Sequence, residues 1–175
     1  MPKIIENARE QIIDEARKQL FSRGYAGTTI RSVAKACGIG VGTVYNYFPS
    51  KDLMLSAFML EDWHTSMASL RSLSPGDFDS FFTGINSALS GFISKYEFLF
   101  RDKDASASFA SVFSERHLQL RRQIEEIIAP LCREGATDYS DPGFLTGYIA
   151  ESILLWAMSG TDIEDQLAVL RRLLI

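Results

Sequence analysis

The chain has few of the residues that disulfide-rich, metal-binding and membrane proteins require. It contains only two cysteines, Cys37 and Cys132, and their wide separation argues against a disulfide framework. Two histidines are too few for a histidine-rich metal site, so we expect no metal and no cofactor. No apolar run reaches about 18 residues, and residues 1–10 lack the apolar core of a signal peptide. We therefore expect a cytoplasmic protein with no transmembrane helix.

Patterns typical of catalysis are equally scarce. Glu61-x-x-His64 is half of an arrangement that helical di-iron sites use twice. The other histidine, His117, follows Ser114 instead of a glutamate at that spacing. Neither histidine suggests a Ser-His-Asp arrangement. We therefore predict that the chain is not an enzyme.

No stretch shows the alternation of apolar and polar residues that a strand requires. Apolar residues instead recur every three or four positions along most of the chain, which predicts an all-α fold with about nine helices. The helices are expected at residues 4–23, 30–37, 41–48, 51–73, 78–95, 105–134, 144–158 and 162–175, with a short segment at 96–100.

The net charge of −4 conceals an asymmetry along the chain. Residues 1–55 hold eight lysines and arginines against five acids, whereas the remainder holds ten against seventeen. A basic N-terminal region attracts phosphates, although charged, solvent-exposed helix faces would give the same counts.

Residues 28–51 have the pattern of two short helices joined by a glycine-rich turn. Thr28 and Thr29 supply hydroxyls that can cap the first helix, and Gly38 follows where a left-handed residue ends a helix. The second helix, 41–48, is too short to be stable alone and carries polar and aromatic side chains. This is the helix-turn-helix pattern, in which the second helix enters the DNA major groove. With helix 4–23 it makes a three-helix module.

The last two expected helices differ in where their apolar residues lie. Helix 144–158 is apolar on more than one side, so several of its faces must be covered, whereas helix 162–175 is amphipathic. We assign residues 1–50 to a helix-turn-helix DNA-binding domain and residues 51–175 to a second, all-helical domain.

Residues 4–52 resemble the DNA-binding domain of the TetR family of bacterial transcriptional regulators. The resemblance covers under a third of the chain. Gly40 departs from it, because the family commonly has a serine there to cap the recognition helix. The spacing from Lys51 to Leu53 is also shorter than in the family. The matching residues are Gly24-Tyr25-x-x-Thr28-Thr29, Val33-Ala34-x-x-x-Gly38-Ile39 and Gly42-Thr43-x-Tyr45-x-Tyr47-Phe48-x-x-Lys51.

The resemblance implies a ligand-responsive regulator, most often a repressor, that binds a palindromic operator in double-stranded DNA as a homodimer. One N-terminal module would lie in each of two successive major grooves. The C-terminal domain, 51–175, would bind a small-molecule effector that changes the spacing of the modules. The last two helices, within 142–175, would form the dimer interface, and no membrane is involved.

Five residues of the module are candidates for contacts with phosphates. Tyr45, Tyr47 and Lys51 bring three phosphate-reaching groups within seven residues, although the tyrosines could instead be core aromatics. Thr29 could offer its hydroxyl or N–H to a phosphate, or could act only as a helix cap. Arg31 could reach a base or a phosphate, or could be an ordinary surface charge.

Five further residues are candidates for approach to the bases. Thr43 and Asn46 can reach base edges, because an asparagine pairs with adenine in the major groove, and Val41 can contact a thymine methyl. Gly40 and Gly42 allow close approach of the backbone, or serve only the turn.

The candidate effector-binding residues are aromatic, which would suit an apolar or aromatic ligand, and they lie on helices that enclose the family's pocket. Ordinary core packing is the alternative for each. For the whole protein, the alternative is a TetR-like fold that acts through protein partners, or through thiol sensing by Cys132. The candidates are Trp63, Phe82, Phe109, Phe113 and Tyr148.

Overall fold

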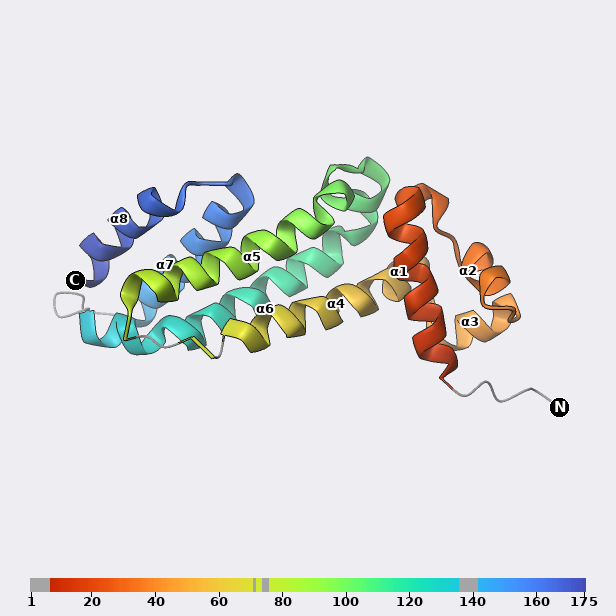
Figure 1. Cartoon of the computed structure of the whole chain (residues 1–175), viewed down its shortest axis with the longest axis horizontal. Coiled ribbons are helices and arrows are strands. Elements are labelled where there is room, and N and C mark those ends of the chain that lie inside the picture. Colours follow the sequence, from red (N-terminus) through yellow and green to blue (C-terminus); the bar gives the residue numbers. More distant parts are fainter. Residues whose placement is uncertain (1–6, 71, 74–75, 136–141) are drawn as a thin grey trace. The chain divides into compact units, whose positions relative to one another are not determined.

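The computed structural model describes residues 7–70, 72–73, 76–135 and 142–175, apart from the side chains of 110–116, 133–135 and 142. Within these ranges the chain forms eight α-helices and no strand, which confirms the all-α class (Figure 1). The segment expected at 96–100 is part of the fifth helix. The helices are α1 (Ala8–Gly27), α2 (Ile30–Ala36), α3 (Val41–Tyr47), α4 (Lys51–Leu70), α5 (Phe78–Arg101), α6 (Lys103–Gly135), α7 (Pro142–Ser159) and α8 (Ile163–Leu174).

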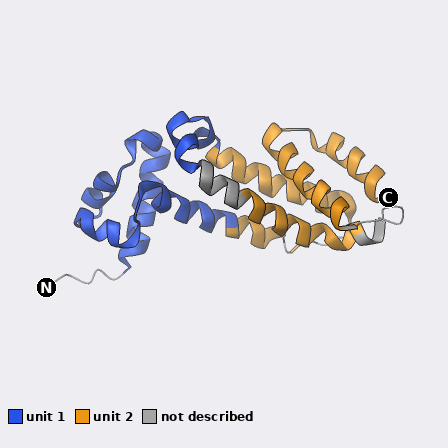
Figure 2. Ribbon diagram, turned by 180° about the vertical axis from the view of Figure 1, so that it is seen from behind, with its two compact units in different colours: residues 1–63, 97–109 blue, residues 64–96, 110–175 orange. Residues whose placement is uncertain are grey.

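The helices divide between two compact units (Figure 2). Unit 1 comprises Met1–Trp63 and Glu97–Phe109, and unit 2 comprises His64–Tyr96 and Ala110–Ile175. Helices α1 to α3 therefore belong to unit 1, and α7 and α8 belong to unit 2. The three helices between them, α4 to α6, each contribute to both units. The functional division at residue 50 remains a prediction.

Glycines mark a kink and a helix end in unit 1, although α1 continues to Gly27 and does not end at residue 23 as expected. Gly24 has φ 72° and ψ −178°, so α1 kinks there before its last turn. The hydroxyl of Thr28 donates to the carbonyl of Gly24 at 2.9 Å. Gly38, with φ 66°, follows α2, because glycine adopts this left-handed conformation without a steric penalty.

The core of unit 1 forms on the apolar stripe of α1. Ile12, Ala16 and Leu20 are fully buried, and α2 packs against both α1 and α3. Burying a large aliphatic side chain contributes about 1.5–3 kcal/mol, so tertiary packing stabilises α2 and α3 despite their shortness.

The core of unit 2 combines aromatic and aliphatic residues. Leu145, Ile149 and Ile153 line the buried side of α7. On α8, the buried Gln166 amide donates to Asn86 Oδ1 at 3.0 Å and to the Thr161 carbonyl at 2.8 Å, so its donors are satisfied. The buried residues of the other helices in this unit include Phe81, Phe82, Ile85, Leu89, Ile124 and Ile128.

Candidate nucleic-acid interface

Helix α2 begins with a reciprocal cap. The Thr29 hydroxyl accepts from the Ser32 N–H at 3.0 Å, and the Ser32 hydroxyl oxygen accepts from the Thr29 N–H at 3.0 Å. The Ser32 side chain also donates to Oε1 of the buried Gln19 at 2.6 Å, which links the cap to α1. Capping is therefore the observed role of Thr29, and its donors are already engaged with Ser32.

In helix α3 one side chain, that of Val44, is buried, and most of the other residues are exposed. Val44 is fully buried and anchors the helix to unit 1, whereas Gly42 and Asn46 are exposed. Tyr45 and Tyr47 are 50% and 45% exposed, so neither tyrosine is a core residue. A short helix with exposed polar and aromatic groups can offer several hydrogen bonds to one partner. We call this exposed set, Gly42, Tyr45, Asn46 and Tyr47, the α3 surface.

The remaining base-contact candidates lie at the start of α3. Gly40 is the N-cap, with φ −70° and ψ 145°, and its carbonyl accepts from the Thr43 N–H at 3.0 Å. No side chain caps this helix, because glycine has none to offer. Val41 and Thr43 are half-buried at the edge of the α3 surface. A Cβ added at Gly42 would meet open space, so packing within the protein does not require a glycine there.

Arg31 is exposed on α2, and Lys35 is exposed one turn later on the same helix. Both cations belong to unit 1, like the α3 surface. They account for part of the positive charge that the sequence concentrates in residues 1–55.

Lys51 has a more enclosed position than its predicted phosphate contact suggests. Its ammonium donates to the Tyr25 carbonyl at 2.6 Å and lies 3.3 Å from the centroid of the Tyr25 ring. Desolvation lowers the pKa of Lys51, against the opposite effect of the Asp52, Asp102 and Asp104 carboxylates. Lys51 therefore connects the start of α4 to the end of α1, and a phosphate contact would have to coexist with this bond or replace it.

Tyr25 is the centre of this connection, and residue type and spacing alone predict no role for it. Its hydroxyl donates to Asp52 Oδ1 at 2.6 Å, and its ring packs edge-on against Phe109 at 6.0 Å between centroids. Burial, followed by the hydrogen bond to Asp52, raises the pKa of Tyr25. The matching Gly24-Tyr25 pair was the one available signal for this residue.

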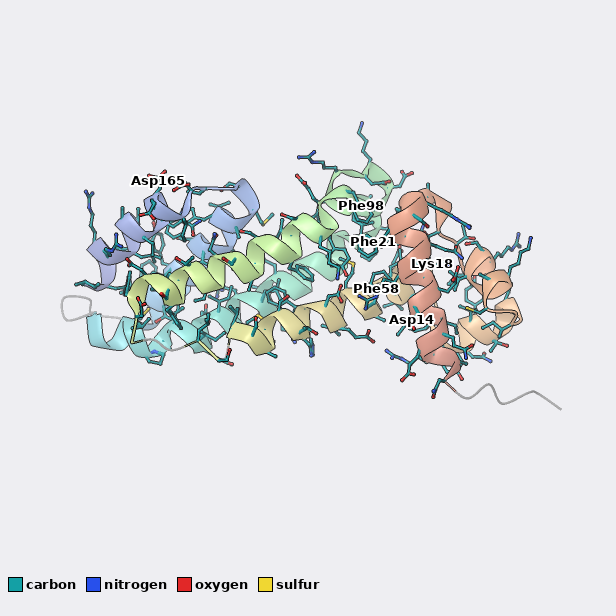
Figure 3. All side chains as sticks on the ribbon, viewed as in Figure 1. Asp14, Lys18, Phe21, Phe58, Phe98 and Asp165 are labelled. Atoms are coloured by element: carbon teal, nitrogen blue, oxygen red, sulfur yellow. The ribbon has the colours of Figure 1, made fainter. Side chains whose placement is uncertain are left out.

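A second set of contacts joins α1 to α4 and to α5 within unit 1. Arg17 Nη1 lies 2.6 Å from Asp62 Oδ1, and the guanidinium carbon of Arg17 lies 5.0 Å from the centroid of the Phe58 ring. On the same helix, Phe21 packs edge-on against Phe98, with 5.6 Å between ring centroids (Figure 3). The sequence does not predict these contacts, because nothing in the spacing relates Arg17 to a residue 45 positions later.

The structure does not assign the candidate effector residues to a single unit. Trp63 and Phe109 are buried in unit 1, whereas Phe82 is buried in unit 2 and packs against Phe78 and Phe81. Tyr148 is 56% exposed on α7. The side chain of Phe113 lies outside the described residues. The effector site therefore remains a prediction.

Other kinds of site find little support in the described part of the chain. No group of three or more metal-ligating side chains occurs there. Likewise, none of the helices it contains combines the length and apolarity needed to cross a bilayer.

Comparisons with known proteins agree with this geometry. Residues 12–58 match the family described as "Bacterial regulatory proteins, tetR family". The HTH-type transcriptional regulator UidR of Escherichia coli K12 is 30% identical over 63 residues, which cover 36% of this chain and 32% of UidR. The match thus spans about a third of the length of that curated relative.

Solved structures extend the similarity to the whole fold. Salmonella enterica GusR has a TM-score of 0.73 at 17% identity, with 98% of each chain covered. Thermus thermophilus FadR, a TetR-family repressor in complex with lauroyl-CoA, has a TM-score of 0.58 at 24% identity, covering 95% of this chain and 92% of FadR. The matched family consists of regulatory proteins, in agreement with the prediction that this chain is not an enzyme. Residues 12–58 of this chain thus match the tetR family of bacterial regulatory proteins, and the chain shares the fold of GusR and FadR.

Proposed function

We propose that this protein is a ligand-responsive transcriptional repressor that binds a palindromic operator as a homodimer. The observation that carries the proposal is the α3 surface, where tyrosines about half exposed flank Asn46 on a helix anchored by the buried Val44. Aromatic hydroxyls and an amide on an exposed recognition helix match the donors and acceptors of a DNA groove.

The interface residues divide by chemistry. Arg31, Tyr45, Tyr47 and Lys51 would contact phosphates and hold the module in register on the duplex. A phosphate contact by Thr29 would have to replace one of its hydrogen bonds to Ser32. Thr43 and Asn46 would form hydrogen bonds with the edges of the bases, and Val41 would contact a thymine methyl. Gly40 and Gly42 would allow the protein backbone to approach the bases closely.

Dimerisation would use the exposed side of α7. Four large apolar side chains on this helix are more than half exposed in the single chain: Phe144 (70%), Tyr148 (56%), Leu155 (62%) and Met158 (67%). We call these four residues the α7 stripe. Contiguous exposed apolar residues indicate a covered surface in the functional assembly. Val169 and Ile175, at 44% and 87% exposed, would extend the interface within residues 142–175.

The effector is proposed to be small and apolar or aromatic. FadR, of the same fold, binds lauroyl-CoA, which supports a ligand-binding role for the second domain. Candidate contacts remain Trp63, Phe82, Phe109, Phe113 and Tyr148. Of these, Tyr148 belongs to the α7 stripe, so its exposure supports a dimer contact over a pocket contact.

Thiol sensing is a less favourable alternative. Cys132 is fully buried, and burial raises the pKa of the Cys37 thiol, with a further contribution from Glu15. Both conditions reduce reactivity, because the thiolate is the reactive form and must be accessible.

The test is a gel shift of the purified chain on the intergenic DNA upstream of its own gene, across a series of salt concentrations. We expect a specific complex that weakens as salt rises, because lysine and arginine contacts release counterions from DNA. Absence of any sequence-specific complex at low salt would contradict the proposal. If the complex forms but no candidate effector dissociates it from DNA, only the proposed response to a ligand is contradicted.

A further inference from the structure

One charged residue interrupts the α7 stripe. The stripe residues lie at positions 144, 148, 155 and 158, and the missing position in this heptad spacing is 151. Glu151 occupies it, with a side chain that is 48% exposed. An interface that covers the stripe would therefore also cover this carboxylate, which is costly unless the charge has a partner.

The partner of Glu151 comes from the neighbouring helix of unit 2. His117 Nε2 of α6 lies 2.8 Å from Glu151 Oε1, and the histidine side chain is 40% exposed. Close packing of α6 and α7 brings the two groups together. A Cβ added at Gly147 would come within 3.3 Å of Glu125 Oε1 on α6. The carboxylate on the stripe therefore already has a hydrogen-bonding partner in the single chain.

The stripe is nearly symmetric about Glu151. Phe144 and Met158 each lie seven residues from it, and Tyr148 and Leu155 lie three and four residues away. A second copy of α7, packed antiparallel about a two-fold axis at this point, would place Phe144 opposite Met158 of the other copy. The same axis would bring the two Glu151 carboxylates together. Each carboxylate would then face a second polar pair instead of an apolar side chain, and its own histidine would offset the repulsion between the two charges.

We propose that the His117–Glu151 pair is the polar centre of the α7 interface and selects a second copy of this chain in one antiparallel register. The inference rests on the dimer of the proposed function. A shifted register, or an apolar helix from another protein, would desolvate the pair without placing a matching pair opposite it. A single polar residue in an apolar seam sets register in this way, at some cost in affinity.

The pair is tested by measuring the dimer dissociation constant of the full chain by analytical ultracentrifugation. His117→Ala is expected to weaken self-association roughly 10- to 100-fold, because it leaves Glu151 unpaired in the interface. Glu151→Leu completes the apolar stripe and is expected to tighten self-association, with a lower dimer dissociation constant. The double variant is expected to match Glu151→Leu, since the histidine has no role once the carboxylate is gone.

Two controls distinguish a specific role of the His117–Glu151 pair from general effects of substitution on the dimer. His64, exposed on α4, offers a matched histidine, and His64→Ala is expected to leave the dissociation constant unchanged. A mixture of tagged wild type with untagged Glu151→Leu tests selectivity. We expect fewer mixed dimers than random pairing would give, because one pair would then face a leucine.

The outcomes distinguish the two levels of the proposal. A monomeric wild-type chain would overturn the proposed dimer, and this inference with it. A dimeric wild type whose affinity is unchanged by His117→Ala, or that pairs at random with Glu151→Leu, would overturn only the role of the pair.

Discussion

The α3 surface and the α7 stripe both expose aromatic side chains, but their surroundings differ. Tyr45 and Tyr47 have Asn46 between them, on a seven-residue helix held by one buried valine. The α7 stripe is interrupted by the paired carboxylate of Glu151 and lies on an 18-residue helix whose opposite side is part of the core of unit 2. The polar surface can remain hydrated until a charged ligand arrives, whereas the apolar stripe favours permanent cover. Exposure alone therefore does not identify a partner.

The largest expected effects come from placing one aspartate in each region. Val44→Asp buries a charge at a fully buried position and is expected to destabilise unit 1 by more than ~3 kcal/mol. Leu155→Asp, at a position 62% exposed, is expected to change the stability of the isolated chain by less than about 0.5 kcal/mol while abolishing dimerisation. Urea unfolding below the dimer dissociation constant, with light scattering at higher concentration, separates the two. Equal destabilisation by both substitutions would contradict the contrast.

Two substitutions on the α3 surface come next in size. Tyr47→Ala is expected to weaken binding to all DNA sequences by a similar amount, because the residue would contact phosphate. Asn46→Ala is expected to cost about 1–3 kcal/mol on the operator and to relax the preference at one base pair. Fluorescence anisotropy on a set of operator variants measures both. A uniform loss for both variants would contradict base reading by Asn46.

A smaller effect is expected at the joint between α1 and α4. Tyr25→Phe removes the hydrogen bond to Asp52 and is expected to lower the free energy of unfolding by about 1–2 kcal/mol. Because the folded state raises the pKa of Tyr25 above its ordinary value of 10.0, this contribution is complete below pH 10. It is lost as the pH rises through the folded-state pKa.

Unfolding of the wild type and Tyr25→Phe between pH 8 and pH 11 measures this dependence. Lys51 is present in both proteins, so most of its own titration cancels in the difference between them. If the difference in free energy of unfolding between wild type and Tyr25→Phe grows above pH 10, the predicted direction of the pH dependence is wrong.

The smallest expected effect is at the cap of α3. Gly40→Ser supplies the side-chain acceptor that this helix lacks and should stabilise unit 1 by a few tenths of a kcal/mol. Space is available, because a Cβ at position 40 would lie 3.7 Å from Thr43 Oγ1. Thermal unfolding shows the gain, and Gly42→Ser, inside the helix, serves as the matched control. A decrease in stability would indicate that the Gly40 backbone conformation does not suit a capping side chain.

Local signals in the sequence predicted the helix-turn-helix well. The cap at Thr29, the kink at Gly24 and the break at Gly38 each depend on residues within four positions. Hydrogen bonding of this kind is encoded locally, so residue type and spacing suffice to predict it.

Long-range contacts could not be predicted in the same way. The bond from Lys51 to Tyr25 and the pair of Arg17 with Asp62 join residues 26 and 45 positions apart. Side-chain length and charge allow such pairs but do not select them. The pairing of His117 with Glu151 is similar, since it depends on the packing of α6 against α7.

Each unit is built from two separate segments of the chain, which limits how domains can be exchanged between related proteins. Unit 1 requires residues up to Trp63 and also the later segment Glu97–Phe109, so two separate pieces of chain build one body. A chimera joined at residue 50 would separate Arg17 from its native Asp62, and Tyr25 from Asp52 and Phe109. The N-terminal helix-turn-helix therefore cannot be exchanged between relatives as a single segment, unless the recipient supplies equivalent partners at these positions.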